Sequence, residues 1–192
     1  MFPDPEALRL VVDFLEDKKL PYMVIGGLAN AVWGEPRLTR DADFKVSIGE
    51  LALADFRRMV FERFPERQTA IPAHKRSPQV VHAWARPNVP VDFLVSVFDY
   101  ERMAIERATE ALVQGVEARL CTAEDFVVHK AIANREQDWI DVERVLLKQK
   151  AKLDREYVLK WLKEFSEALE EPSILGRYLD LEQERHDPRA RE

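Results

Sequence analysis

The segment "IGGLANAVWGEPRLTRDADFKV", residues 25–46, decides the fold, because it places a glycine pair ahead of two acids that are one residue apart. An apolar run that ends at Ile25 predicts a strand buried on both faces. Gly26 and Gly27 end this strand, and the following "LANAVW" predicts a short helix that leaves the turn. The alternation in "DADFKVS", residues 41–47, predicts a second, half-buried strand.

Two carboxylates lie on one face of this second strand. Successive side chains of a strand point to opposite faces, so Asp41 and Asp43 share one face while Ala42 and Phe44 share the other. Two carboxylates on one face repel each other unless water or a cation neutralises them, and Mg²⁺ prefers carboxylate oxygen. The pair therefore predicts either a divalent metal site or a solvated strand start.

A third acid favours the metal site. Asp92 lies within "VPVDFLVSV", residues 89–97, a strand-like run with apolar neighbours on both sides. Burying an unpaired carboxylate is costly, so this position needs an explanation. Three acids on two strands beside a glycine turn are the ingredients of a two-metal phosphoryl-transfer site.

Before Thr122 the rest of the chain alternates between strand patterns and helix patterns. From Thr122 onward the pattern is helical. "TAED" predicts a helix N-cap at Thr122, and we expect a loop over residues 65–78. The expected strands are 79–86 and 89–97, paired around the turn "RPN", and a weaker one at 111–119. The expected helices are 4–19, 50–62, 99–108, 123–134, 137–149, 154–169 and a short one after Pro172. This order predicts an α/β (α+β) core followed by a helical subdomain.

Composition narrows the class of protein. The 192 residues are 46% hydrophobic, which suffices for a core, and the net charge of −6 argues against nucleic-acid binding driven by bulk charge. Cys121 is the only cysteine and the four histidines show no metal-ligand spacing, so no zinc site or internal disulfide is expected. No stretch reaches membrane-spanning length and the N-terminal residues do not resemble a secretory signal. We therefore expect a cytoplasmic protein without membrane contact.

The combined motifs resemble the signature of the nucleotidyltransferase superfamily, which includes DNA polymerase beta. A hydrophobic residue, two glycines, thirteen further residues and an Asp-hydrophobic-Asp-hydrophobic run follow in that order. Asp92 matches the third carboxylate of the superfamily. The resemblance implies the nucleotidyltransferase fold: a mixed, mostly antiparallel sheet flanked by helices, with a C-terminal helical subdomain. We accordingly expect a core at 1–120, a helical subdomain packed on it at 121–182 and a frayed tail at 183–192.

A subfamily resemblance comes from two stretches. "GEPRLTRDADF" is similar to the corresponding part of minimal, AbiEii-like nucleotidyltransferases, and residues 121–147 resemble their C-terminal motif of a lysine, an arginine and spaced aspartates. Here these are Lys130, Arg135, Asp138 and Asp141, with a shorter spacing than in the larger AbiEii toxins. On one unbroken helix Asp141 would lie about 20° from Lys130 and Asp138 about 80°. A purely structural ion pair is therefore the alternative for these residues.

The resemblance also implies a mechanism. Asp41, Asp43 and Asp92 would be the catalytic residues and the ligands of two Mg²⁺ ions. Asp41 and Asp43 would hold the metal on the triphosphate of an NTP. Asp92 would help bind the second metal and activate the acceptor hydroxyl for in-line attack on the α-phosphorus, after which pyrophosphate leaves.

Further residues are implied to contact the nucleotide. Gly26 and Gly27 would line the phosphates through backbone amides, and Arg40 and Lys130 would supply positive charge. Arg37 is another candidate for phosphate or acceptor contact. Surface salt bridges are the commoner role of arginines, and a solvated helix lysine is the alternative for Lys130.

The implied function is Mg²⁺-dependent transfer of a nucleoside monophosphate from an NTP to a hydroxyl of RNA, protein or a small molecule, with a role in a toxin–antitoxin system and a toxin or antitoxin partner. A basic face around Arg37, Arg40, Lys75 and Arg76 would serve an RNA acceptor. Two alternatives stay open: a non-catalytic, antitoxin-like or regulatory module that binds NTP, and a structural role in an oligomer.

Overall fold

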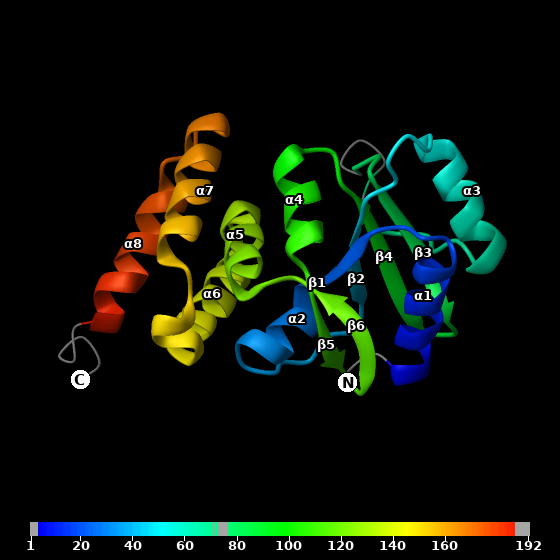
Figure 1. Cartoon of the computed structure of the whole chain (residues 1–192), viewed down its shortest axis with the longest axis horizontal. Helices are drawn as coiled ribbons and strands as arrows, with labels where there is room; N and C mark the ends of the chain where they lie inside the picture. Colours follow the sequence, from blue (N-terminus) through cyan, green and yellow to red (C-terminus); the bar gives the residue numbers. More distant parts are fainter. Residues whose placement is uncertain (1–3, 71, 73–76, 187–192) are drawn as a thin grey trace. The chain divides into compact units, whose positions relative to one another are not determined.

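The computed structural model describes residues 4–70, 72 and 77–186, and the chain divides into two compact units (Figure 1). The first, called the sheet unit, comprises residues 1–29 and 37–121. The second, called the helical unit, comprises residues 30–36 and 122–192. Helix α2 (Gly26–Trp33) begins in the sheet unit and ends in the helical unit, so the segment quoted above supplies parts of both.

The sheet unit is built on one six-stranded mixed sheet with the strand order β3-β4-β2-β1-β6-β5. The β1–β2, β3–β4 and β5–β6 pairs are antiparallel, whereas β1–β6 and β2–β4 are parallel. This confirms the mixed, mostly antiparallel sheet. The strands are β1 (Tyr22–Ile25), β2 (Ala42–Val46), β3 (Val80–Arg86), β4 (Val89–Val95), β5 (Thr109–Val113) and β6 (Val116–Leu120).

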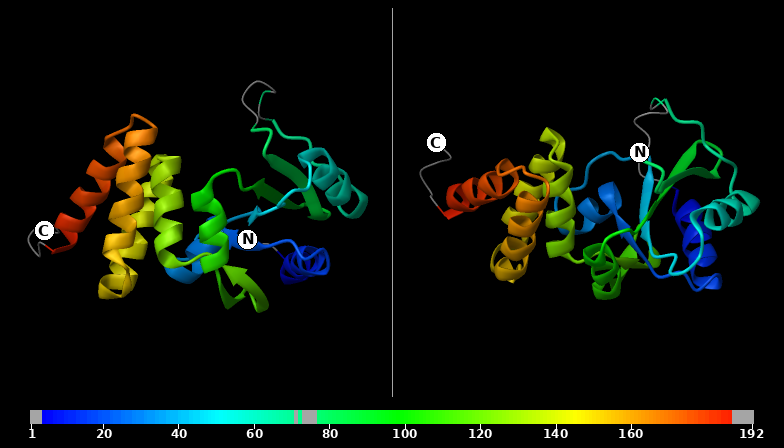
Figure 2. Two further views of the ribbon diagram at one scale, coloured as in Figure 1. Left: turned by 45° about the horizontal axis from the view of Figure 1, so that its top comes forward. Right: turned by 90° about the horizontal axis from the view of Figure 1, so that it is seen from above.

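Helices flank this sheet on both faces. Figures 1 and 2 show α1 (Pro5–Asp17) and α3 (Leu53–Arg63) on one face and α4 (Asp99–Arg107) on the other. The face under α1 and α3 is the aromatic core, where the Phe93 ring of β4 is the centre. Ring centroids of Phe14, Phe44, Phe56 and Phe64 lie 6.1–6.3 Å from that of Phe93. The contact with Phe44 is stacked and the other three are edge-to-face or tilted, and aromatic pairs prefer edge-to-face and offset-stacked arrangements.

The face under α4 carries the opposite set of side chains. Lys45 of β2 is buried there, and its Nζ forms an ion pair with Glu101 of α4. Because Asp43 is two residues before Lys45, it shares this face. The acids of the quoted segment therefore lie on the sheet face away from the aromatic core.

One expected strand was wrong. The single weak strand at 111–119 is a hairpin of β5 and β6, and the two residues between them, Gln114 and Gly115, both have positive φ, 51° and 78°. Two residues with positive φ form the tight turn that matches the twist of paired strands. Glutamine is an uncommon residue there, so the pattern did not reveal the turn.

The helical unit contains four α-helices besides the end of α2, within the described residues. They are α5 (Ala123–Ala133), α6 (Glu136–Gln149), α7 (Arg155–Ala168) and α8 (Ser173–His186), with a 3-10 turn at Lys150–Lys152. Thr122 caps α5 as predicted, since its hydroxyl oxygen accepts the backbone N–H of Asp125 at 3.1 Å. Helix α8 is longer than expected and includes residues 183–186 of the predicted frayed tail, whereas 187–192 lie outside the described residues. No helix in the described part of the chain has the length and hydropathy to span a bilayer.

Candidate active site

The three predicted acids meet on one face of the sheet. Asp41 immediately precedes β2 and Asp43 is its second residue, so their side chains share a face. Asp43 pairs in register with Ile25 of β1 and, on its other side, with Asp92 of the parallel strand β4. All three acids are partly exposed. The parallel β2–β4 pairing therefore places Asp92 beside the acids of the quoted segment.

The ionised form of Asp41 is disfavoured by its surroundings. Burial, and after it the negative charge of Asp92, raises the pKa of the Asp41 carboxyl above its ordinary value. The positive charges of Arg67, Arg40 and His82 act in the opposite direction but are outweighed. Ionised Asp41 is thus held at a cost, and a bound cation would relieve it.

The glycine pair lies very close to β2 and to the loop that precedes it, so that neither position has room for a side chain. Gly26 has φ +65°, and a Cβ at this residue would lie 2.0 Å from Oδ2 of Asp43. A Cβ on Gly27 would lie 2.6 Å from Oγ1 of Thr39, in the loop that leads to Asp41. Both glycines are the first residues of α2, where backbone N–H groups have no partner within the helix. The helix start and the acid-bearing strand are therefore in direct contact.

Asp92 is bound by two side chains that the sequence did not indicate. Its Oδ1 accepts a hydrogen bond from Nη2 of Arg67 and lies 2.8 Å from Nδ1 of His82 on β3. The Arg67 and His82 nitrogens are 3.3 Å apart, and all three side chains are 16% exposed. Asp92 thus has the hydrogen-bond donors that its position requires.

Arg67 is held by its backbone as well as its side chain. Its N–H donates to the carbonyl of His82 at 3.0 Å, and the N–H of Trp84 donates to the carbonyl of Pro65 at 2.8 Å. The Arg67 guanidinium carbon lies 5.9 Å from the centroid of a Trp84 ring. Part of the predicted loop at 65–78 therefore runs along β3 and orients the guanidinium.

One of the two missed residues carried a usable signal. A three-residue turn "RPN" centred on Pro87 would place His82 opposite Asp92. The structure has this pairing, with a register shift between Trp84 and Arg86. Arg67 comes from an irregular segment, and no periodicity links it to Asp92. Hairpin register could have found His82 but not Arg67.

Of the three acids, Asp41 and Asp43 suit a metal ion better than Asp92 does. Within the described residues, no group of three or more histidine, cysteine, aspartate or glutamate side chains converges to hold a metal ion. Asp41 and Asp43 offer two carboxylates on one strand face, and such oxygens suit Mg²⁺. Asp92 is instead bound to Arg67 and His82. The residues therefore fit one metal ion at the first two acids more readily than a pair of ions.

Lys130 lies in the helical unit and is surrounded by carboxylates. Its Nζ is 2.7 Å from Oδ1 of Asp138 and 2.9 Å from Oδ2 of Asp141, and all three residues are buried. The two helices expected at 123–134 and 137–149 are separate, because Asn134 adopts a left-handed conformation between α5 and α6, so the angles for one unbroken helix do not apply. This break turns both acids toward the lysine.

The ion pairs stabilise the charged form of Asp138. Burial raises the pKa of this carboxyl, but hydrogen bonds from Arg135 and Lys130 outweigh burial and hold the pKa below its ordinary value. Arg135 itself is 75% exposed at its side chain. The structure thus brings all four residues of the predicted C-terminal motif into one cluster.

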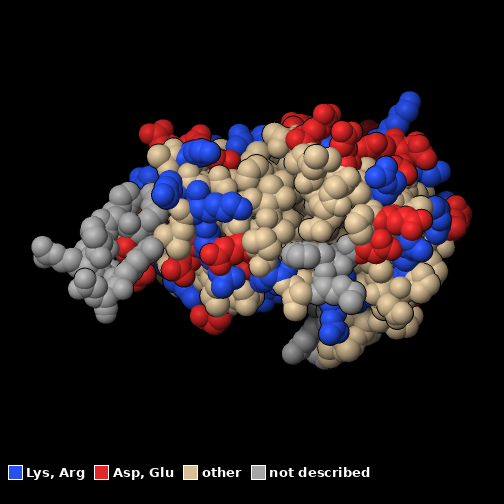
Figure 3. Space-filling view, turned by 90° about the horizontal axis from the view of Figure 1, so that it is seen from below, with Lys and Arg blue, Asp and Glu red and all other residues tan. Residues whose placement is uncertain are grey.

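The predicted basic residues beside the site are only partly described. Arg40 is exposed and affects the pKa of Asp41, and Arg37 is partly buried. Lys75 and Arg76 lie outside the described residues. On the face in Figure 3, lysine and arginine side chains are interspersed with aspartate and glutamate, as the net charge suggests.

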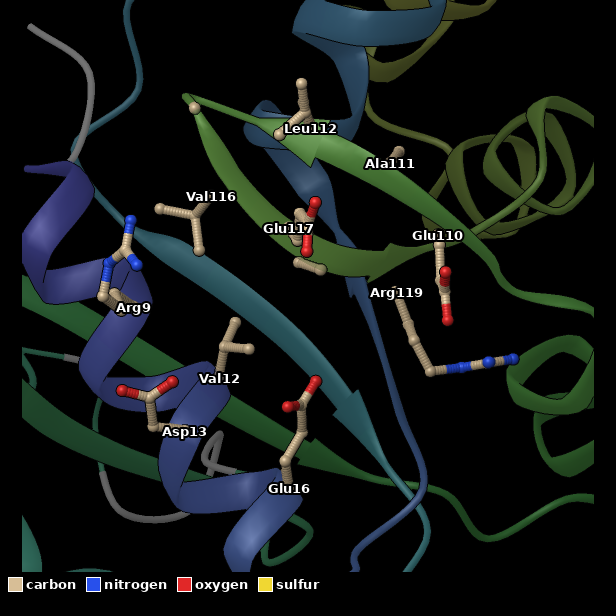
Figure 4. A pocket seen from close by; sticks show the side chains of 12 residues that line it. Arg9, Val12, Asp13, Glu16, Glu110, Ala111, Leu112, Val116, Glu117 and Arg119 are labelled. Atoms are coloured by element: carbon tan, nitrogen blue, oxygen red, sulfur yellow. The ribbon is translucent and has the colours of Figure 1, made fainter.

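A large cavity of about 800 Å³ lies apart from these acids (Figure 4). Charged side chains of α1, namely Arg9, Asp13 and Glu16, line one side, and the β5–β6 hairpin lines the other. None of the predicted site residues lines it. This cavity and the candidate site therefore consist of different residues.

The sequence was also compared with known families and curated proteins. A family model described as "Nucleotidyl transferase of unknown function (DUF2204)" matches residues 5–178. The comparison with curated proteins finds no match.

Three solved structures resemble the fold at low sequence identity. An antigenic nucleotidyltransferase-like protein from Paracoccidioides brasiliensis is 16% identical with a TM-score of 0.52, covering 92% of this chain and 94% of that one. The antibiotic-resistance factor ANT(2'')-Ia is 15% identical with a TM-score of 0.52, covering 94% and 96%. The lincosamide antibiotic adenylyltransferase LnuA, bound to lincomycin, is 12% identical with a TM-score of 0.51, covering 76% and 98%. At such identities the likeness shows the fold alone.

Proposed function

The chain belongs to the nucleotidyl transferase family of unknown function (DUF2204), and from that premise we propose that it moves a nucleoside monophosphate from an NTP to an acceptor hydroxyl with the help of Mg²⁺. The observation that carries the proposal is the meeting of Asp41, Asp43 and Asp92 on one sheet face, beside Gly26. Membership in the family makes nucleotidyl transfer the chemistry to test at this place.

Asp41 and Asp43 are the proposed metal ligands. Their oxygens are the type that Mg²⁺ prefers. Burial, and after it the negative charge of Asp92, raises the pKa of Asp41, so a bound cation would favour its ionised form. When bound, Mg²⁺ supplies positive charge that neutralises the triphosphate. The role of the two aspartates is to hold that charge at the start of β2.

Asp92 is the proposed proton acceptor. As the acceptor oxygen forms its bond to the α-phosphorus, the bond from that phosphorus to the bridging oxygen breaks and pyrophosphate leaves. The hydroxyl proton passes to the Asp92 carboxylate. Arg67 and His82 both contact Oδ1 of Asp92, so they fix the direction of this carboxylate.

The phosphate contacts stay predictions. Gly26 and Gly27 open α2, and backbone N–H groups at a helix start suit phosphate oxygens. Arg40 is exposed and close enough to influence Asp41, which favours a phosphate contact. Lys130 was predicted to bind the triphosphate, but its Nζ lies between two buried carboxylates, and this supports the structural alternative.

The acceptor is the least defined part of the proposal. RNA, protein and small-molecule hydroxyls all suit the proposed chemistry, and LnuA, a structural neighbour, is named for acting on an antibiotic. The toxin–antitoxin role also stays a prediction. A non-catalytic NTP-binding module is the second candidate, because Asp92 is already paired with Arg67 and His82.

Transfer of α-labelled nucleotide tests the proposal. Each of the four NTPs would be incubated with Mg²⁺ and with total RNA, total protein or small hydroxyl acceptors. We expect label on one acceptor class, lost in Asp41→Asn and Asp43→Asn but retained in the surface control Asp55→Asn of α3. Mg²⁺-dependent NTP binding without transfer to any acceptor would support the non-catalytic candidate. Undiminished transfer in the Asp41 and Asp43 variants would refute the site.

A further inference from the structure

A second, smaller cavity in the sheet unit is lined in part by the two residues that contact Asp92. It has a volume of about 270 Å³ and is formed by α3, the start of β3 and the segments 66–69 and 77–78. Arg67 and His82 line it, and these are the two residues that contact the Asp92 carboxylate. Arg67 and His82 therefore connect this cavity to the proposed proton acceptor.

Two arginines that line the cavity each have one buried nitrogen without a hydrogen-bond partner. Among the described residues, Nε of Arg57 and Nε of Arg67 are buried without a hydrogen-bond partner. Other atoms fix both guanidinium groups: Nη2 of Arg57 donates to the carbonyl of Pro78 at 2.6 Å, and Nη2 of Arg67 donates to Asp92. Buried donors without partners are unfavourable, so a ligand that accepts hydrogen bonds from them is favoured.

The chemistry of the lining favours an anion. The guanidinium group matches carboxylate and phosphate oxygens in geometry and charge. Ser77 and Thr69 add hydroxyl groups to the wall, whereas the lining acid Glu66 is exposed to solvent. The volume is below the range of about 300–1,000 Å³ that is usual for whole drug-sized ligands, so the cavity suits one anchoring group.

We propose that this cavity binds an anionic group of the acceptor, a phosphate or a carboxylate, and thereby places the acceptor hydroxyl beside Asp92. The inference rests on the proposed transfer function and specifies the class of acceptor, one that carries an anionic group. Arg67 acts as a positioning residue, because its guanidinium contacts Asp92 and the same residue lines the cavity. Acceptors with an anion near the hydroxyl are then preferred to polycationic ones.

Arginine side-chain NMR tests the anion site without any transfer reaction. The full chain, free of Mg²⁺ and NTP, would be titrated with inorganic phosphate while the Nε–Hε signals of Arg57 and Arg67 are followed. We expect both signals to shift and saturate together. If neither signal shifts in a saturable way, the proposal is wrong.

Matched variants locate the binding. Arg57→Lys and Arg67→Lys keep the positive charge but remove Nε, and each should weaken phosphate binding about tenfold or more. Arg58→Lys, on the next residue of α3 and paired with Asp55 at the surface, should leave binding unchanged. Equal affinity in wild type, Arg57→Lys and Arg67→Lys would overturn the assignment.

Parallel titrations with phosphate and acetate identify the anion. Tighter phosphate binding assigns a phosphate-bearing acceptor, and tighter acetate binding assigns a carboxylate-bearing one. Saturable phosphate or acetate binding together with absent nucleotidyl transfer would refute the proposed function but leave the anion site intact. Transfer to a polycationic acceptor, unaffected by Arg57→Lys, would refute the anion proposal alone.

Discussion

Both units of the chain gather carboxylates around a cation, but they balance the charges differently. In the helical unit, Lys130 lies buried between Asp138 and Asp141, and the pKa of Asp138 is lowered. In the sheet unit, the pKa of Asp41 is raised, and its carboxylate neighbours are partly exposed. Partners in the first cluster stabilise the ionised form of Asp138, whereas the surroundings of Asp41 disfavour its ionised form. We propose that this difference in the pKa shifts separates a structural cluster from a ligand-binding one.

The largest expected effect comes from removing the cation of the helical unit. Lys130→Met leaves Asp138 and Asp141 buried without their lysine, and breaking a buried ion pair in this way costs about 3–5 kcal/mol. Urea unfolding of the full chain measures this loss. Lys163→Met, at an exposed position of α7, is the matched control and should change stability by less than about 0.5 kcal/mol. If Lys130→Met and wild type are equally stable, the claim that the Lys130 cluster stabilises the fold is wrong.

Asp138→Asn should destabilise the chain in a pH-dependent way. The pKa of Asp138 is lowered in the folded state, so its stabilising contribution is present above the ordinary aspartate value and is lost as the pH falls toward the lowered value. At pH 7 the loss should be about 1.5–3 kcal/mol, because charged hydrogen bonds are removed. Unfolding curves of variant and wild type between pH 3 and pH 7 should converge in acid. A pH-independent difference would argue against the charge-based explanation.

Gly26→Ala tests the contact between the helix start and Asp43. A left-handed residue with a side chain costs roughly 1–2 kcal/mol, and the added Cβ would also displace the Asp43 carboxylate. Gly115→Ala is the matched control, since Gly115 also has positive φ but has open space around its Cβ position. By thermal unfolding, Gly115→Ala should show the backbone cost alone and Gly26→Ala a larger loss, and only Gly26→Ala should lose nucleotidyl transfer. Normal transfer in Gly26→Ala would contradict the proposed geometry.

Asp41→Asn should have the smallest effect on stability and the opposite sign to Asp138→Asn. The pKa of Asp41 is raised in the folded state, so ionisation costs stability as the pH rises through the raised value. The variant should therefore be more stable than wild type at pH 7, by less than about 1 kcal/mol after solvent screening. The gain should vanish in acid, where Asp41 is protonated. A destabilised Asp41→Asn at pH 7 would mean that local cations already balance its charge.

The sequence predicted most of the elements that carry the site. The apolar run before Gly26, the alternation from Asp41 and the pair of strands around "RPN" all correspond to observed strands. The β5–β6 hairpin was missed, because Gln114 has no strong preference for the positive φ that its turn requires. Local sequence patterns therefore predicted an element correctly where the residues prefer the backbone conformation that the fold requires.

The sequence could predict those candidate site residues whose positions follow from strand alternation or from hairpin pairing. Asp41 and Asp43 were expected on one face by strand alternation, and His82 follows from the hairpin that contains Asp92. Arg67 reaches Asp92 from an irregular segment, and the left-handed Asn134 decides how Lys130 meets its acids. Such contacts depend on tertiary packing, which periodicity does not encode.

Metal binding to three versions of the chain tests the central claim most directly. Mn²⁺ in the presence of an NTP would be titrated by electron paramagnetic resonance into wild type, Asp43→Asn and Asp141→Asn, each checked by circular dichroism to be folded. The charge comparison predicts that Asp141→Asn binds like wild type and that Asp43→Asn loses at least about tenfold in affinity. Wild-type binding in Asp43→Asn, or an equal loss in folded Asp141→Asn, would contradict the claim that the sheet unit holds the ligand-binding cluster.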